Sequence, residues 1–307
     1  MNESLRTCLL TGAGGFVGSR LAARLHGAGC TVCAITRTGE SIAGLPYVRV
    51  VGSSESQKSV EDALHASRPD VVFHLAAEVI PEHGREDIER LLDGNVRFAL
   101  HLLEGMRLQG CRAMVNASTG WQHYRGRDYD PVCLYAATKQ AAEDLMEYYA
   151  NACEMRICSL VMLDNYGSGD PRQKLFYWLR KAAGSQDPIA FSAGEQLLDL
   201  VHVDDVARAF VVAGQDVLSR QAGGHTRFRV GSSRQLRLRE LAARYEQISG
   251  RPLNIAWGAR AYRVRELMCP PDTPALLPGW EARIEIEQGL REMVEEATAL
   301  GAERARA

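Results

Sequence analysis

The chain has 307 residues, of which 46% are hydrophobic and 24% are charged, with a formal net charge of −2 at pH 7. This length and balance suit one large α/β domain, with or without a smaller appendage, and they give no indication of a nucleic-acid partner. No apolar run approaches the roughly 18–20 residues that span a bilayer, so we expect no membrane partner. The first motif begins at Thr11, too early to leave room for a cleaved signal, and we expect a cytoplasmic location.

The first half of the chain alternates short apolar runs, typical of buried parallel strands, with helix-like segments. The expected strands are residues 7–11, 31–36, 48–51, 70–75, 112–117 and 156–161. The expected helices are residues 16–26, 59–66, 88–108 and 135–150. This order predicts right-handed βαβ units and therefore the α/β class, with a Rossmann-type doubly wound parallel sheet.

After residue 163 the loops lengthen and the strands shorten, as in the Gly-Ser-Gly-Asp-Pro stretch at 167–171. We therefore expect a dinucleotide-binding domain over 1–163. Residues 164–307 are expected to form mainly a substrate-binding region, with some segments returning to the Rossmann core. The pattern over 286–299 predicts a surface helix.

The eight cysteines include a single pair with CxxC spacing, Cys30 and Cys33. Such a pair is typical of a redox centre or of half a metal site. Here it borders the alternating apolar run of an expected strand, and no second ligand pair follows. The sequence therefore favours buried strand thiols and predicts no metal site.

The stretch TGAGGFVGSR, Thr11–Arg20, lies between the first expected strand and the first expected helix. Gly12 permits a tight turn, Gly15 lets the backbone approach a pyrophosphate, and Gly18 lets the helix pack close to the strand. The N–H groups at the start of the helix then face the phosphates. In this context the pattern predicts dinucleotide binding rather than a purely structural turn.

The second expected strand ends in the sequence Ile35-Thr36-Arg37-Thr38. An acidic residue here would bind a ribose 2′-hydroxyl and favour NAD, whereas Arg37 offers positive charge to a 2′-phosphate. The alternative for Arg37 is a solvated loop arginine. We therefore expect NADP(H) as the cofactor, with NAD(H) as the alternative.

Tyr135 and Lys139 stand four residues apart in YAATK, so a helix would project both from one face. An ammonium group near a phenol lowers the phenol pKa from about 10, which suits proton exchange with a substrate oxygen. The fifth expected strand ends at Ser118 and Thr119, where a hydroxyl would meet a substrate carbonyl. A YxxxK pair alone is common by chance, but both elements together predict a proton-transfer site.

These motifs resemble those of the extended short-chain dehydrogenases/reductases of the sugar-nucleotide epimerase/dehydratase/reductase type. The resemblance covers nearly the whole chain and is carried by TGAGGFVGS, DVVFHLAA, NAST, YAATK, YGSGD and LVHVDDVARAF. It implies an enzyme with a Rossmann sheet and a smaller C-terminal substrate-binding region. It also implies a homodimer, formed through the helices expected at 88–108 and 135–150.

The resemblance assigns a role to each matched residue. Thr119, Tyr135 and Lys139 would be the catalytic set, with Tyr135 as general acid/base and Lys139 also binding the nicotinamide ribose. Cofactor contacts are expected from Gly12, Gly15, Phe16, Val17, Gly18, Arg37, Leu75, Ala76, Ala77, Asn95, Tyr135 and Lys139. Substrate contacts are expected from Ser118, Trp121, His123, Asn165, Lys174 and Arg263. Asn95 is equally well explained as structural, Trp121 and His123 as loop packing, and Lys174 and Arg263 as solvated charges.

The choice of reaction depends on what surrounds the catalytic set. The family's dehydratases carry Asp-Glu directly after the threonine, where this chain has Gly120 and Trp121, so dehydration is not expected. Its epimerases retain a tightly held NAD, whereas Arg37 favours an exchanging NADPH and net reduction. The segment from YGSGD to LVHVDD resembles the 4-ketoreductases of deoxysugar pathways. The resemblance therefore implies NADPH-dependent reduction of a nucleotide-linked 4-keto-6-deoxyhexose.

Three departures from the family pattern leave other functions open. Leu198 stands where an arginine commonly grips the diphosphate, the usual asparagine before the YG motif is displaced, and the third strand ends in Gly52-Ser53 without an acid. The alternatives are an NAD-dependent nucleotide-sugar 4-epimerase, an NADPH reductase of a non-sugar carbonyl, and a dinucleotide-binding regulatory protein without turnover. The complete catalytic set argues against the last.

Overall fold

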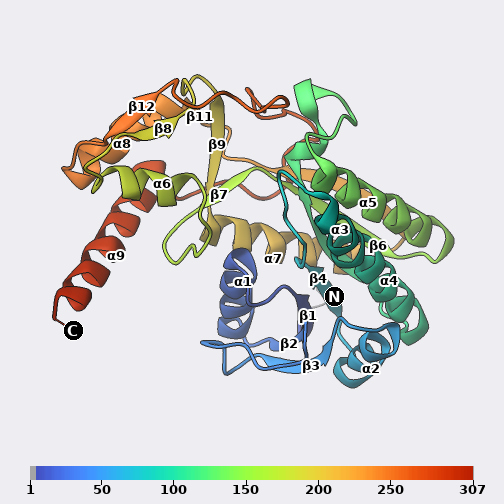
Figure 1. Ribbon diagram of the computed structural model, residues 1–307. Helices are drawn as coiled ribbons and strands as arrows, with labels where there is room; N and C mark the ends of the chain where they lie inside the picture. The colour runs from blue at the N-terminus through green and yellow to red at the C-terminus, as the bar shows by residue number, and fades with distance from the viewer. Residues whose placement is uncertain (1–4, 307) are drawn as a thin grey trace. The chain divides into compact units, whose positions relative to one another are not determined.

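The computed structural model describes residues 5–306, which form two compact units (Figure 1). The first unit runs up to Met162 and also contains Val206–Val230 and Pro271–Trp280. The second unit consists of Leu163–Asp205, Gly231–Pro270 and the residues from Glu281 on. The chain therefore leaves the first unit after Met162 and returns to it twice, and the cofactor-binding and substrate-binding roles of the two regions stay predictions.

The first unit is built on a seven-stranded sheet in which every neighbouring pair is parallel. Its strand order is β10-β6-β5-β4-β1-β2-β3. The strands are β1 (Thr7–Thr11), β2 (Thr31–Thr36), β3 (Arg49–Ser53), β4 (Val71–His74), β5 (Ala113–Thr119), β6 (Arg156–Met162) and β10 (Gly224–Val230). The order reverses beside β1, so the expected Rossmann-type doubly wound fold is confirmed.

Helices pack on both faces of this sheet. On one face, α2 (Gln57–Ser67), α4 (Phe98–Gln109) and α5 (Leu134–Ala152) share one hydrophobic core with the strands. On the other face, Phe73 of β4 meets Phe210 of α7 (Val203–Ser219), with ring centroids 6.5 Å apart. Val72 of β4 lies in the hydrophobic core shared with α2, α4 and α5. Because successive side chains of a strand point to opposite faces, the next residue, Phe73, faces α7 on the other side of the sheet.

The helix expected over 88–108 is interrupted. It consists of α3 (Ile88–Leu92), a π-helical turn at Asp93–Arg97, and α4. A π-turn inserts an extra residue into the helix and is frequent at functional sites. Here it contains Asn95, which is fully buried.

Within the described residues, the second unit contains short strands and three helices of its own. A three-stranded sheet has the order β11-β9-β7, and a parallel pair joins β12 to β8. The elements are β7 (Asp164–Tyr166), α6 (Leu175–Ala182), β8 (Ile189–Phe191), β9 (Leu197–His202), β11 (Gln235–Arg237), α8 (Leu238–Ser249), β12 (Ile255–Trp257) and α9 (Ile286–Arg306). The expected helix at 286–299 is confirmed as part of α9.

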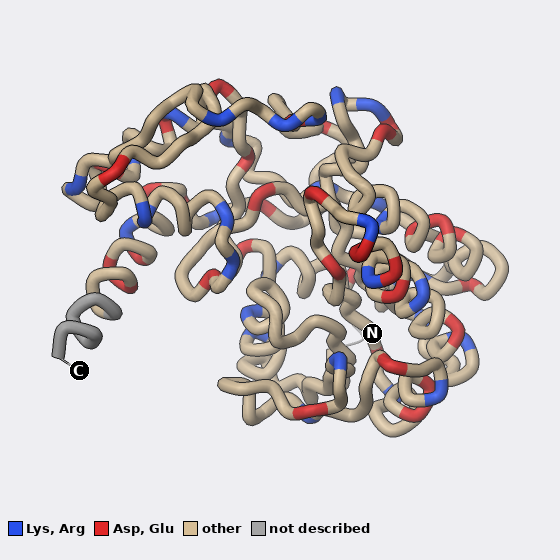
Figure 2. The backbone as a smooth tube through the Cα atoms, in the orientation of Figure 1, with Lys and Arg blue, Asp and Glu red and all other residues tan. Residues whose placement is uncertain are grey.

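The cysteine pair is buried, as the sequence favoured. Cys30 is 6% exposed and donates to the carbonyl of Leu5, and Cys33 is fully buried in β2. Among the residues that the structure describes, no cluster of three or more His, Cys, Asp or Glu side chains is suited to hold a metal. Within the same residues, no helix is both long and apolar enough to cross a membrane. Figure 2 shows positive and negative positions interspersed along the chain.

Candidate active site

The turn between β1 and α1 (Phe16–Gly27) requires glycine at two positions. Gly12 has φ +73°, and a Cβ there would lie 2.7 Å from the backbone nitrogen of Ala76. A Cβ on Gly18 would lie 2.0 Å from the carbonyl oxygen of Gly12. The turn and the helix start are therefore in direct backbone contact, and no other residue fits at either position.

The start of α1 is suited to an anion. Gly15 is the N-cap residue and has no side chain to cap the helix, while its N–H donates to Gly12 O at 3.0 Å. The peptide dipoles concentrate partial positive charge at Phe16 and Val17, where the helix begins. A glycine cradle leading into an uncapped helix N-terminus fits the pyrophosphate of a dinucleotide.

The segment after β4 lies against this turn. Leu75 N–H donates to Thr11 O at 3.2 Å, and Ala76 N–H donates to Thr11 Oγ1 at 3.1 Å. The same Oγ1 is 2.8 Å from Nδ1 of His74, a fully buried side chain. Burial, with a smaller contribution from the nearby Lys139 charge, lowers the pKa of His74 to about 3. His74 is therefore neutral and fixes the backbone that leads to Ala77.

Thr119 and Tyr135 lie at adjoining ends of β5 and α5. Thr119 is the last residue of β5, and its Oγ1 accepts a hydrogen bond from Trp121 N–H at 3.3 Å, which leaves the hydroxyl proton to donate elsewhere. Tyr135, in the first turn of α5, packs edge-on against Trp121 with ring centroids 6.2 Å apart. Trp121 therefore contacts both predicted catalytic residues.

Tyr135 and Lys139 are both buried, at 8% and 1% exposure. Burial raises the pKa of Tyr135, with a smaller contribution from Cys133. Burial also lowers the pKa of Lys139 to about 8, against the opposing effect of the Glu143 carboxylate. Desolvation therefore dominates the pKa of both groups, and the action of Lys139 on the phenol stays a prediction. The buried phenol keeps its proton at neutral pH, as a proton donor requires.

Asn95 connects the loop after β4 to α5. Its Oδ1 accepts from Glu78 N–H at 2.8 Å, and its Nδ2 donates to Glu78 O at 3.0 Å and to Thr138 Oγ1 at 2.9 Å. Thr138 in turn donates to the carbonyl of Tyr135 at 2.8 Å. These contacts give Asn95 a structural role, and its contact with a cofactor stays a prediction.

Ser118 points into the interior of the first unit. It is 1% exposed and its hydroxyl donates to the carboxylate of Glu143 on α5. With the Gln122 amide oriented to satisfy its neighbours, Gln122 donates to Ser118 Oγ at 2.7 Å. Glu143 also pairs with Nε of Arg227 on β10 at 2.8 Å. These contacts show Ser118 as part of a buried network, and its substrate contact stays a prediction.

His123 follows Trp121 in the loop after β5. Its Nδ1 lies 3.2 Å from the carbonyl oxygen of Arg127. This contact helps to hold the loop, in agreement with loop packing, the alternative role considered for His123. A role toward substrate stays a prediction for both residues.

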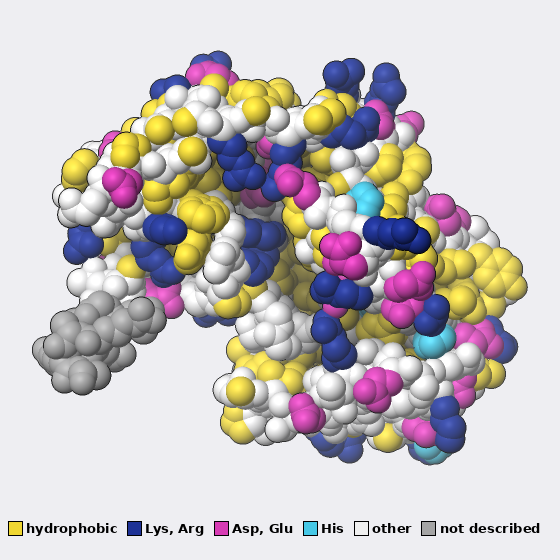
Figure 3. Space-filling model, in the orientation of Figure 1, with side chains coloured by type: hydrophobic (Ala, Val, Ile, Leu, Met, Phe, Trp, Pro, Cys, Tyr) yellow, Lys and Arg dark blue, Asp and Glu magenta, His cyan; other side chains and the backbone are white. Residues whose placement is uncertain are grey.

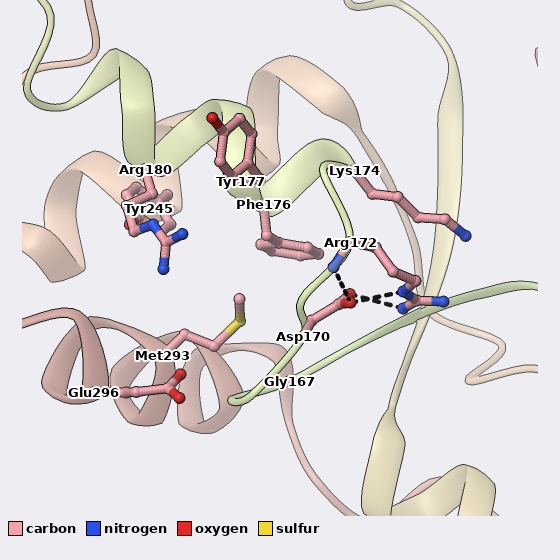
Figure 4. Close-up of a pocket in the computed structure, with 10 residues that line it drawn as sticks. All are labelled: Gly167, Asp170, Arg172, Lys174, Phe176, Tyr177, Arg180, Tyr245, Met293 and Glu296. Carbon is pink, nitrogen blue, oxygen red and sulfur yellow. Dashed lines mark hydrogen bonds and ion pairs between the residues drawn. The ribbon is translucent and has the colours of Figure 1, made fainter. Parts of the chain in front are cut away.

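In the second unit a small pocket lies between α6, α8, α9 and the loop before α6 (Figure 4). Lys174 lines it, and its pKa is lowered by burial and by the neighbouring charge of Arg172. Asn165 is not a lining residue, but its Oδ1 accepts from Arg172 Nη2 at 2.8 Å. Arg263 is exposed and lies outside the lining residues.

Arg172 is a further residue near this pocket that no sequence motif predicts. Its guanidinium binds Asp170 through Nε at 2.6 Å and Nη2 at 2.7 Å. The only sequence signal for it is an arginine two residues after an Asp in a glycine-rich loop. Leu198, found where an arginine was expected, is 9% exposed in the core of the second unit.

The fold and the site together define a class of protein. A glycine-rich turn after the first strand of a Rossmann sheet, with Thr119, Tyr135 and Lys139 at β5 and α5, is the arrangement of an NAD(P)-dependent oxidoreductase of the short-chain dehydrogenase/reductase type. Residues 8–231 match the model of the NAD dependent epimerase/dehydratase family. The chain belongs to that family.

Individual relatives agree with this assignment. The chain is 26% identical over 269 residues to a CDP-abequose synthase of Yersinia pseudotuberculosis, covering 85% of this chain and 90% of the relative. It is 27% identical over 320 residues to a UDP-glucose 4-epimerase of Mycolicibacterium smegmatis, covering 94% of this chain and 97% of the relative. A solved structure of MoeE5 in complex with UDP-glucose and NAD has a TM-score of 0.80 at 27% identity, covering 96% of this chain and 99% of that chain.

Proposed function

We propose that this enzyme uses NADPH to reduce the 4-keto group of a nucleotide-linked 4-keto-6-deoxyhexose. The observation that carries the proposal is Arg37, an exposed cation directly after β2 where an acid would favour NAD. The similarity to a CDP-abequose synthase supports the substrate class. The residues around Gly12 and Gly18 fit the pyrophosphate of the cofactor, because only a backbone without Cβ atoms forms that cradle.

When bound, the reduced nicotinamide supplies a hydride to the carbonyl carbon. Thr119 donates a hydrogen bond to the carbonyl oxygen, because its Oγ1 already accepts from Trp121 N–H. Tyr135 donates its proton to that oxygen as negative charge develops, which completes the alcohol. Lys139 supplies positive charge beside the phenol, and Tyr135 afterwards regains a proton from solvent.

The test follows oxidation of NADPH and of NADH at the nicotinamide absorbance, with CDP- and TDP-4-keto-6-deoxyglucose as substrates. Rapid oxidation of NADPH with little use of NADH is the expected result. Rapid oxidation of NADH with little use of NADPH would contradict the Arg37 interpretation. If neither cofactor is oxidised with either nucleotide sugar, the proposed ketoreductase activity is contradicted.

A nucleotide-sugar 4-epimerase is the second candidate, because the chain also matches a UDP-glucose 4-epimerase over 94% of its length. An epimerase of this kind returns the hydride to the same carbon and consumes no cofactor overall. Interconversion of UDP-glucose and UDP-galactose by the purified protein, without added NADPH, would favour it over the reductase.

We further propose that the enzyme works in the cytoplasm as a homodimer. Large hydrophobic side chains are exposed on α3, α4 and α5, namely Ile88, Leu92, Leu100, Leu108 and Tyr148. Figure 3 shows hydrophobic side chains gathered at the surface over α5. Exposed apolar surface of this kind is typical of a protein–protein contact. Asn165, Lys174 and Arg263 remain proposed substrate contacts.

A further inference from the structure

Two arginines hold the carboxylate of Glu78, just after β4. Nη2 of Arg37 pairs with Oε1, and Nη2 of Arg90 on α3 lies 3.0 Å from Oε2. The Glu78 side chain is 16% exposed, whereas those of Arg37 and Arg90 are 79% and 60% exposed. Figure 2 shows acidic and basic positions side by side at α3. The carboxylate is therefore the recessed member of the cluster.

The backbone of Glu78 is fixed in place. Asn95, itself fully buried, accepts from Glu78 N–H at 2.8 Å and donates to Glu78 O at 3.0 Å. With this backbone fixed and Oε2 held by Arg90, the Glu78 carboxylate stays beside Arg37 when that arginine binds a phosphate. Its negative charge is a permanent part of the surroundings of Arg37.

Arg37 uses only part of its hydrogen-bonding capacity for this pair. A guanidinium has five N–H donors, and the Arg37 side chain is largely exposed, so its other donors are open to a phosphate. Arg90 also pairs with Asp87 at 3.1 Å, so two arginines and two acids leave the cluster without net charge. A 2′-phosphate on Arg37 would therefore bring a dianion next to a neutral cluster.

We propose that Glu78 is a specificity-determining residue for the cofactor, whose carboxylate limits the preference for a 2′-phosphate over a 2′-hydroxyl. The inference rests on the proposed use of NADPH, with Arg37 at the phosphate. Repulsion acts between the Glu78 carboxylate and the phosphate dianion, whereas a 2′-hydroxyl carries no charge. The effect therefore falls mainly on NADPH.

The test is the substitution Glu78→Gln, which keeps an oxygen acceptor for Arg37 and removes the charge. Dissociation constants of NADPH and NADH are measured by nicotinamide fluorescence on the full-length protein. The ratio of the NADH constant to the NADPH constant is expected to rise about tenfold. The matched control is Glu89→Gln on α3, which removes the same charge from an exposed neighbour of Arg90 and should change the ratio less than about twofold.

A second variant, Arg90→Gln, changes the ratio in the opposite direction. It leaves Glu78 with less compensating charge, so the NADPH preference should fall severalfold. An unchanged or lower ratio in Glu78→Gln, or an unchanged ratio in Arg90→Gln, overturns the inference. Failure of the proposed NADPH use looks different: Arg37→Ser would then leave the ratio of the two constants unaltered.

Discussion

Tyr135 is the residue on which the proposed chemistry depends most directly. Replacing it with Phe removes one oxygen and leaves the packing against Trp121 in place. We expect the reduction rate to fall by roughly 10²–10⁴, because the carbonyl oxygen loses its proton donor. NADPH should still bind, as measured by nicotinamide fluorescence. A variant with the wild-type rate would remove Tyr135 from the mechanism.

Lys139 illustrates a conflict between stability and activity. Its pKa is lowered to about 8 by burial, so at pH 7 the folded state retains a desolvated ammonium. Between about pH 8 and 10.5, Lys139 binds more protons in the unfolded state than in the folded state. The contribution of Lys139 to the free energy of unfolding therefore rises with pH over this range.

Lys139→Met should accordingly abolish reduction while raising the free energy of unfolding at pH 7 by roughly 3 kcal/mol. The gain should shrink as pH rises toward 10. Urea denaturation at pH 7 and 9.5 measures it, with Lys58→Met as the control, since Lys58 forms an exposed pair with Asp62. Equal stability of wild type and Lys139→Met at pH 7 would contradict the burial argument.

At the scale of one helix, α1 depends on Gly18 for its approach to the turn. Gly18→Ala places a methyl group 2.0 Å from Gly12 O, so the turn must shift. We expect dinucleotide affinity to fall at least tenfold, measured by NADPH titration. Gly27→Ala at the other end of α1 is the matched control, because its Cβ meets no atom within 4 Å. That variant should bind NADPH normally.

Helix α5 is joined to the sheet by Glu143. This carboxylate is 1% exposed, bonds Ser118 of β5 and pairs with Arg227 of β10. Glu143→Ala leaves these partners without their acceptor, and we expect a loss of about 3–5 kcal/mol in unfolding free energy. Asp144→Ala, at the next and exposed position, should change stability by less than about 0.5 kcal/mol. Similar urea midpoints for both variants would show that the network contributes little.

The elements that sequence predicted best are those with continuous apolar runs. β1 to β6 were all expected, because buried parallel strands have that pattern. β10 was not located, since His225, Arg227 and Arg229 interrupt its apolar residues. His225 instead bonds Ser159 of β6 at 2.8 Å, and Arg227 pairs with α5. Because these polar residues bond partners far away in the sequence, no apolar run marks this half-buried edge strand.

Contacts between residues distant in the sequence also limit how much of the candidate site can be predicted. Local sequence predicts Tyr135 and Lys139 from their helical spacing, whereas Thr119 is predicted from its place at a strand end and from the family resemblance. The link from Asn95 to Thr138 joins residues 43 positions apart, and the pair of Arg37 and Glu78 spans 41. Such contacts form only when βαβ units assemble, and no local hydrophobic periodicity predicts them.

On the scale of the whole molecule, the exposed side chains of α4 and α5 predict the oligomeric state. Leu108→Glu combined with Tyr148→Glu should convert a dimer into a monomer, measured by light scattering during size exclusion. Both side chains are more than half exposed, so the change should not unfold the chain. The control is Val264→Glu in the second unit, at a fully exposed position. A wild-type protein that elutes as a monomer would contradict the proposed dimer.

The late position of β10 has a consequence for synthesis on the ribosome. β6 ends at Met162, yet its outer neighbour begins only at Gly224, and Arg229 then bonds Ala275 and Leu277 through its backbone. While the intervening residues are being translated, β6 presents an unpaired edge that is prone to aggregate with other nascent chains. Slow translation over 163–223 would prolong that exposure, so codon choice in this stretch should affect the yield of folded enzyme.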